Sequence, residues 1–244
     1  ILMSAFVFAG WKEESMDKNL VIGIEGLVGT GKTSICHELL KYIPNAIVLH
    51  AGNIYRAITY QIIKEEIPFE KLYSIDLKDL FKEFEISIGI ENRESVVYAH
   101  GKKIEEKDLQ SLENSMAVSK ISNIANNENA YKIVREYIDG YKKSHTVIFS
   151  GRDTMQIYPD LDYHIFITAD INKRVEWKAK QYGEDVSRKE LKDNILKRDE
   201  LQEKSGYYQI YDNTIVVDVS ESKSIEESTK MVAENIIELN YILQ

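Results

Sequence analysis

Short apolar runs alternate along the chain with stretches whose apolar residues recur every three or four positions. In "KTSICHELLKYI", Ile35, Leu39 and Ile43 recur at the spacing of one helix face. Strands that alternate with helices pair in parallel. We therefore predict an α/β fold of three layers, α/β/α, with a five-stranded parallel core sheet. The apolar runs place its strands near 20–24, 46–50, 146–150, 163–168 and 214–218.

A different pattern occupies the middle of the chain. "FEISIGI" (84–90) and "SVVYAHGKKI" (95–104) read as two strands joined by "ENRE". We expect this insert, about 65–108, to lie outside the core sheet and to cap a binding site.

The stretch "VIGIEGLVGTGKTSICHELL" (21–40) joins a buried strand, a glycine-rich turn and a helix. Its spacing fits G-x-x-x-x-G-K-[ST] in full, which is the phosphate-binding P-loop. Glycines let backbone N–H groups converge on phosphate oxygens, and the helix N-terminus adds positive potential. Lys32 would reach the β and γ phosphates, and Thr33 would ligate Mg²⁺. The predicted cofactors are ATP and Mg²⁺, held by Gly26, Gly29, Thr30, Gly31, Lys32, Thr33 and Ser34.

Composition narrows the class of protein. A net charge of −9 argues against a general nucleic-acid binder. The single cysteine, Cys36, allows no internal disulfide and favours a reducing compartment, so we expect a cytoplasmic protein. The five histidines show no metal-ligand spacing. We expect a small-molecule nucleotide as substrate, no nucleic-acid or membrane partner, and a monomer or weak homodimer.

The N-terminal stretch "ILMSAFVFAGW" is apolar but too short to span a bilayer. Met16 then opens "MDKNLVIGIEG", directly before the P-loop. We interpret 1–15 as an extension, vector-derived or translated from upstream, and 16–244 as one P-loop kinase domain. The alternative is a native arm that packs on a partner.

A P-loop alone does not say where the γ-phosphate goes. The sequence has no N-K-x-D element for reading guanine and no apolar run that ends in Asp-Glu, as a motor ATPase usually has. The remaining candidates are a kinase for a small acceptor and an atypical regulatory NTPase.

Four further stretches carry candidate binding residues in addition to the P-loop: "HAGNIYRAITY" (50–60), "IVREYIDGYKK" (133–143), "VIFSGRDTMQIYPDLDYHIFITAD" (147–170) and "LKDNILKRDELQEKSGYYQI" (191–210). With the P-loop, they make the chain resemble the cytidylate kinase family of nucleoside monophosphate kinases from about 19 to 237. The residues that match the family pattern are Gly52, Tyr55, Arg56, Ala57, Val134, Arg135, Ile138, Gly151, Arg152, Asp153, Pro159, Asp160, Arg198 and Asp199.

The resemblance implies transfer of a phosphoryl group from ATP to CMP or dCMP. Arg56, Arg152 and Arg198 would contact the acceptor phosphate, as several arginines must when two anionic groups approach. The catalytic residues would be Lys32, Arg152 and Arg198.

The same resemblance assigns the base-reading groups and the lid. Arg135 and Asp153 would help to read the base, with Asp153 accepting from the cytosine amino group. Ser119 would also bind the substrate, with Ser122 as a competing alignment. The lid would cover about 180–205, with Gly183 at its joint.

Arg174 and Lys178 lie four residues apart, so they share one helical face. They would serve ATP from the lid side; the alternative is a solvated face next to Glu176.

Several family positions hold other residues. Ala51 replaces a hydroxyl residue, Gln110 replaces an arginine, and Gln202 and Ser205 replace an acidic residue and an arginine of the lid. This pattern of an intact phosphate cradle and an altered acceptor pocket keeps two alternatives open. One is a kinase for a modified nucleotide, a nucleoside or another small molecule, and the other is a nucleotide-binding regulatory protein without kinase activity.

Overall fold

A computed structural model describes residues 18–68, 76–111, 113–114, 117–118, 127–182 and 187–242. The expectations for residues 1–15, for Ser119 and Ser122, and for Gly183 lie outside this described part. In the described part, no helix is both long and apolar enough to cross a membrane.

Five parallel strands form the core of the sheet, in the spatial order β2-β6-β1-β7-β8. This confirms the predicted core sheet, and each strand lies within about two residues of its predicted place. Because β1 is central, the loop that follows it leaves the middle of the sheet at the carboxyl edge, where open α/β sheets bind ligands. The strands are β1 Val21–Gly26, β2 Ala46–His50, β6 Thr146–Ser150, β7 Tyr163–Thr168 and β8 Thr214–Asp218.

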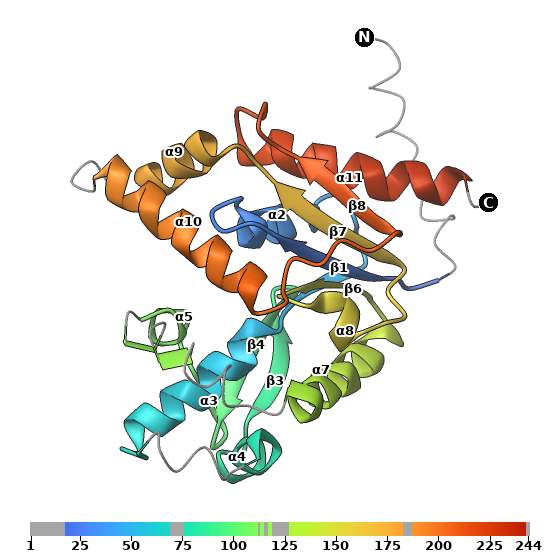
Figure 1. The fold of residues 1–244 in the computed structure, drawn as a ribbon. Helices are drawn as coiled ribbons and strands as arrows, with labels where there is room; N and C mark the ends of the chain where they lie inside the picture. The colour runs from blue at the N-terminus through green and yellow to red at the C-terminus, as the bar shows by residue number, and fades with distance from the viewer. Residues whose placement is uncertain are drawn as a thin grey trace.

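Helices cover both faces of this sheet (Figure 1). Ile22 and Ile24 of β1 pack in one core with residues of α2 (Lys32–Leu39) and α11 (Ile225–Ile242). Val21, which points to the opposite face, belongs to a second core. The predicted three-layer fold is confirmed. The second core includes residues of α3 (Gly52–Lys64), α7 (Asn127–Lys142) and α8 (Thr154–Ile157).

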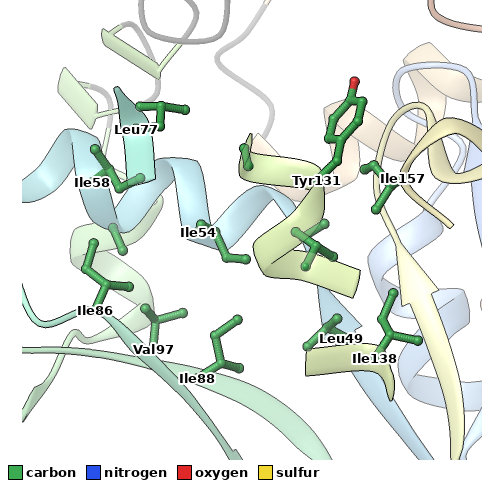
Figure 2. Close-up of a cluster of buried hydrophobic side chains, with 14 of the residues drawn as sticks. Leu49, Ile54, Ile58, Leu77, Ile86, Ile88, Val97, Tyr131, Ile138 and Ile157 are labelled. Atoms are coloured by element: carbon green, nitrogen blue, oxygen red, sulfur yellow. The ribbon is translucent and has the colours of Figure 1, made fainter. Parts of the chain in front are cut away.

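The insert continues the same sheet, so the expectation that it lies outside is wrong. Its strand β4 pairs in parallel with β2 at Val48 and Glu94, and the sheet order runs β3-β4-β2. Figure 2 shows Ile88 and Val97 of the insert in one buried cluster with Ile54 and Ile58 of α3. The elements of the insert are α4 Leu77–Glu83, β3 Ser87–Glu91, β4 Glu94–Ala99, β5 Lys102–Lys103 and α5 Glu106–Leu109.

Arg93 holds the insert against β2 through both its backbone and its side chain. It has a left-handed backbone (φ 68°) in the turn between β3 and β4, and its carbonyl oxygen accepts from Val48 N at 2.8 Å. Its guanidinium donates to three carbonyl oxygens at the end of α2 and the start of β2. These belong to Leu40 (2.9 Å), Ile43 (2.6 Å) and Ala46 (2.8 Å).

Two helices, α9 (Ile171–Tyr182) and α10 (Arg188–Lys204), form the region predicted as the lid, and they pack against each other. Val175, Leu191 and Ile195 bury a small apolar cluster with Val28 of the P-loop. The lid helices therefore rest directly on the nucleotide loop.

Candidate active site

The P-loop has the backbone geometry that a phosphate cradle needs. Gly29 has φ 85°, a left-handed conformation that favours glycine. A Cβ atom on Gly26 would lie 2.2 Å from the carbonyl oxygen of Ile167. Helix α2 begins after Gly31 without a side-chain cap, so its first N–H groups have no side-chain acceptor. These residues fit the triphosphate of a nucleotide.

Lys32 donates from Nζ to the carbonyl oxygens of Gly26 (2.7 Å) and Leu27 (2.9 Å). Burial, followed by the charge of Arg152, lowers the pKa of Lys32 to about 8. A bound anion would raise the pKa of Lys32 again and so favour its charged form.

The three hydroxyl residues of the cradle differ in exposure. Thr33 and Ser34 are exposed in the first turn of α2, which leaves the Thr33 hydroxyl accessible to a metal ion. The buried Thr30 donates to Leu27 O from both its hydroxyl (2.9 Å) and its backbone N–H (3.5 Å), so both groups bond within the loop itself.

Five basic side chains from separate segments come together, and we call them the cationic cluster: Lys32, Arg56, Arg152, Lys178 and Arg198. Burial lowers the pKa of each of the first four, and the nearby charge of Arg198 lowers each of them further. The structure therefore brings together the three arginines that were expected to form a phosphate clamp. A cluster of like charges in one site calls for anionic ligands.

Arg174 lies beside the cradle with its guanidinium turned to protein groups. It is buried, donates to Val28 O at 3.1 Å and forms an ion pair with Asp199. The other oxygen of Asp199 accepts from Val28 N at 2.9 Å and from the Tyr208 hydroxyl at 3.0 Å. Arg174 thus links α9, α10 and the P-loop, and it does not lie on a solvated face. That Arg174 and Lys178 bind ATP stays a prediction.

The acceptor turn, Gly151–Thr154, follows β6. Asp153 has a left-handed backbone (φ 64°) and forms the N-cap of α8. Glu25 of β1 accepts from both the backbone N–H (2.5 Å) and the hydroxyl (2.7 Å) of Thr154, and it lies 3.2 Å from His164 Nε2. Burial favours the neutral form of Glu25, but the hydrogen bonds from His164 and Thr154 outweigh it and hold the pKa low. A buried ionised carboxylate thus fixes the turn.

Tyrosines surround this turn. The Tyr131 hydroxyl donates to Asp153 Oδ2 at 2.6 Å, and the Tyr207 ring centroid lies 6.0 Å from Arg152 Cζ. Burial, followed by the charges of Tyr207 and Asp153, raises the pKa of Tyr55. Sequence reasoning gave the tyrosines no role. The available signal was the pair "YY" just after the lid segment.

Arg135 lies on α7, one turn beyond Tyr131, and its guanidinium forms an ion pair with Glu128 of the same helix. Arg135 therefore shares a helix with Tyr131, which contacts Asp153, and its own guanidinium has a local partner. Its role in binding the base remains a prediction.

The four altered family positions fall into two groups. Ala51 is buried, and its Cβ lies 3.4 Å from where a Cβ on Gly151 would be, so it adjoins the acceptor turn. Gln202 is also buried, and its Oε1 has no hydrogen-bond partner among the described residues. Gln110 and Ser205 are exposed and bond locally, to Glu106 (3.0 Å) and Leu201 O (2.7 Å) respectively.

Comparison with known proteins agrees with this geometry. The family model described as "Cytidylate kinase" matches residues 22–240. The cytidylate kinase of Aquifex aeolicus is 28% identical and covers 89% of this chain and 96% of its own length. That of Caldicellulosiruptor bescii is 29% identical, with 92% and 96% covered. That of Clostridioides difficile is 25% identical, with 89% and 98% covered.

Proposed function

Because the chain belongs to the cytidylate kinase family, we propose that it transfers the γ-phosphoryl group of ATP to a nucleoside monophosphate. The acceptor in this proposal is CMP or dCMP, and the products are the diphosphate and ADP. The observation that carries the proposal is the cationic cluster, which joins the P-loop lysine to arginines of the acceptor turn and the lid.

The donor side would use the P-loop. Backbone N–H groups of Gly29, Gly31 and the start of α2 would hold the phosphates, and Lys32 would turn from its two carbonyl partners to the β and γ phosphates. Mg²⁺ would be bound by Thr33 together with phosphate oxygens, where it would neutralise charge that develops on transfer.

The acceptor side would use the arginines. Arg56 and Arg152 would hold the acceptor phosphate, and Arg198, whose charge acts on both Lys32 and Arg152, would stabilise the charge that develops on transfer. Transfer of this kind depends on alignment and charge stabilisation, so no dedicated general base is required. Asp153 and Arg135 would contact the base. Closure of α9 and α10 would exclude water and so suppress hydrolysis of ATP.

A coupled assay of ADP release tests this function. The acceptors are CMP, dCMP, UMP, dTMP, AMP and GMP, the matching nucleosides, and a sample without acceptor, each with ATP and Mg²⁺. We expect strong stimulation by CMP or dCMP and loss of activity in Lys32→Ala. Stimulation by nucleosides alone would favour a different small-molecule kinase. ATP binding without stimulation by any acceptor would favour a regulatory protein.

A further inference from the structure

We propose that Tyr131 is a specificity-determining residue: its hydroxyl occupies one oxygen of Asp153 and directs the carboxylate to acceptors whose base carries an amino group. The inference rests on the proposed function, because it concerns which acceptors the same site takes. It is carried by the contact between Tyr131 Oη and Asp153 Oδ2, 2.6 Å long and buried.

The position of Tyr131 is fixed by its helix. Its side chain is 7% exposed and packs in the same core as Val134 and Ile138, one and two turns further along α7. Figure 2 shows the tyrosine at the margin of this cluster, with its hydroxyl directed away from the aliphatic side chains. The packing of the ring in the core therefore fixes the position of the hydroxyl oxygen.

Asp153 is held from the other side by its backbone. Thr154, the next residue, is tied to Glu25 through both its N–H and its hydroxyl. Tyr131 then fixes Oδ2, while Oδ1 accepts no hydrogen bond from the residues that the structure describes. One oxygen of a rigid carboxylate remains for a ligand.

The protonation state of Asp153 decides which ligand fits. An ionised carboxylate only accepts hydrogen bonds, so it binds an amino group and repels a ring carbonyl at the same position. A protonated carboxyl would also donate and would lose this distinction. Burial and the charge of Glu25 raise the pKa of Asp153, and the hydrogen bond from Tyr131 opposes them. Tyr131 thus favours the form that discriminates.

The test compares Tyr131→Phe with Tyr158→Phe. Tyr158 is a matched control, because this buried tyrosine also donates from its hydroxyl to an aspartate, Asp139, at 2.9 Å in a part-buried contact. For the wild type and both variants, kcat and KM are measured with ATP and the amino/carbonyl pairs CMP/UMP and AMP/IMP. Thermal melting reports on folding.

We expect the wild type to prefer the amino member of the pair that it uses. Tyr131→Phe should reduce this preference, as a ratio of kcat/KM values, by about tenfold, with KM for ATP changed by less than about twofold. Tyr158→Phe should keep the preference of the wild type.

The remaining outcomes would contradict either the role of Tyr131 or the proposed function. An unchanged preference in an active Tyr131→Phe enzyme, or a wild type that prefers the carbonyl member, would overturn the role of Tyr131 while the kinase function stands. No turnover of any of these monophosphates by the wild type would refute the proposed function, and the inference with it. If Tyr131→Phe does not fold, Asp153→Asn replaces it: retention of the preference there would also overturn the inference.

Discussion

The ammonium group of Lys32 lies among positive charges and turns back on two carbonyl oxygens of its own loop. With a pKa of about 8, this side chain loses its proton in mildly alkaline solution unless a bound phosphate raises the pKa. Its protonation and the binding of nucleotide are therefore coupled.

This coupling predicts a pH dependence of nucleotide affinity. The pKa of Lys32 in the free protein is about 8, and bound phosphates raise it. The dissociation constant for ATP-Mg²⁺ should therefore rise about fivefold from pH 8 to pH 9, as the lysine loses its proton. Calorimetric titration over pH 7–9.5 measures it. Lys32→Arg, which stays protonated, should show a flat profile, and a flat profile in the wild type would contradict the prediction.

Glu25 offers a second prediction, on stability. Glu25→Ala leaves the Thr154 donors and His164 buried without their acceptor, so we expect a loss of about 3 kcal/mol in the free energy of unfolding. Glu25→Gln keeps an oxygen and should lose less. Because the folded-state pKa of Glu25 is lowered, its contribution is present above about pH 4.5 and is lost in more acidic solution. Urea unfolding at pH 7 and at pH 4 checks both statements; equal losses at the two pH values would contradict the second.

The motif residues of the candidate site can be recognised in the sequence, whereas the buried residues that hold the site in place cannot. Lys32 and Thr33 belong to a contiguous motif whose spacing has a physical meaning, and Arg152 follows an apolar strand at its carboxyl end. Glu25 reads as one polar residue in an apolar strand, and Tyr131 as one aromatic residue on a helix. Their partners, Thr154 and Asp153, lie 129 and 22 residues away, so only the folded chain shows the contacts.

At the scale of elements, α9, α10 and the P-loop form one unit. Asp199 is the centre of this unit. Its carboxylate forms an ion pair with Arg174 and accepts hydrogen bonds from Val28 N and the Tyr208 hydroxyl. Asp199 also follows Arg198 in the sequence, so the same contacts hold the backbone beside an arginine that we propose to be catalytic.

Asp199→Asn should therefore affect both stability and catalysis. The buried guanidinium of Arg174 would lose its counter-charge, and we expect about 3 kcal/mol of destabilisation and a fall in kcat of at least about tenfold. The neighbouring Glu200 is the control, because its ion pair with Lys204 is exposed. Glu200→Gln should keep the melting temperature and kcat of the wild type. Equal behaviour of the two variants in melting and steady-state assays would count against an anchoring role for Asp199.

The elements themselves were more predictable than their junctions. Alternating apolar runs located the five core strands because a buried parallel strand must be apolar on both faces. The place of the insert was not predictable in this way, since β4 joins β2 by a single bridge between Val48 and Glu94. The group that secures it, Arg93, looks in the sequence like any charged turn residue.

At the scale of the whole molecule, two cores lie on opposite faces of one sheet, and the insert shares the core of α3 and α7. The P-loop and the insert, which we expect to cap the acceptor site, therefore belong to one continuous framework. Arg93 connects the two through carbonyl oxygens of α2, the P-loop helix, and of the segment that follows it.

Arg93→Ala tests this connection. Three carbonyl oxygens would lose their donor, so we expect about 3 kcal/mol of destabilisation and a higher KM for the acceptor. Lys102→Ala, an exposed change in the same insert, should alter neither. Chemical unfolding and steady-state kinetics measure the two effects. A stable Arg93→Ala protein with an unchanged KM would mean that the bridge at β2 is sufficient alone.

The junction at β2 has a further consequence for association between molecules. A bare β2 would present unpaired N–H and C=O groups at the border of the sheet, four of its five residues being buried and apolar, and such a border is a template for pairing with another chain. Because β4 pairs with this border at Val48, we expect the insert to hinder self-association of the chain. A chain shortened by removal of 65–108 should therefore aggregate, whatever becomes of its catalytic groups.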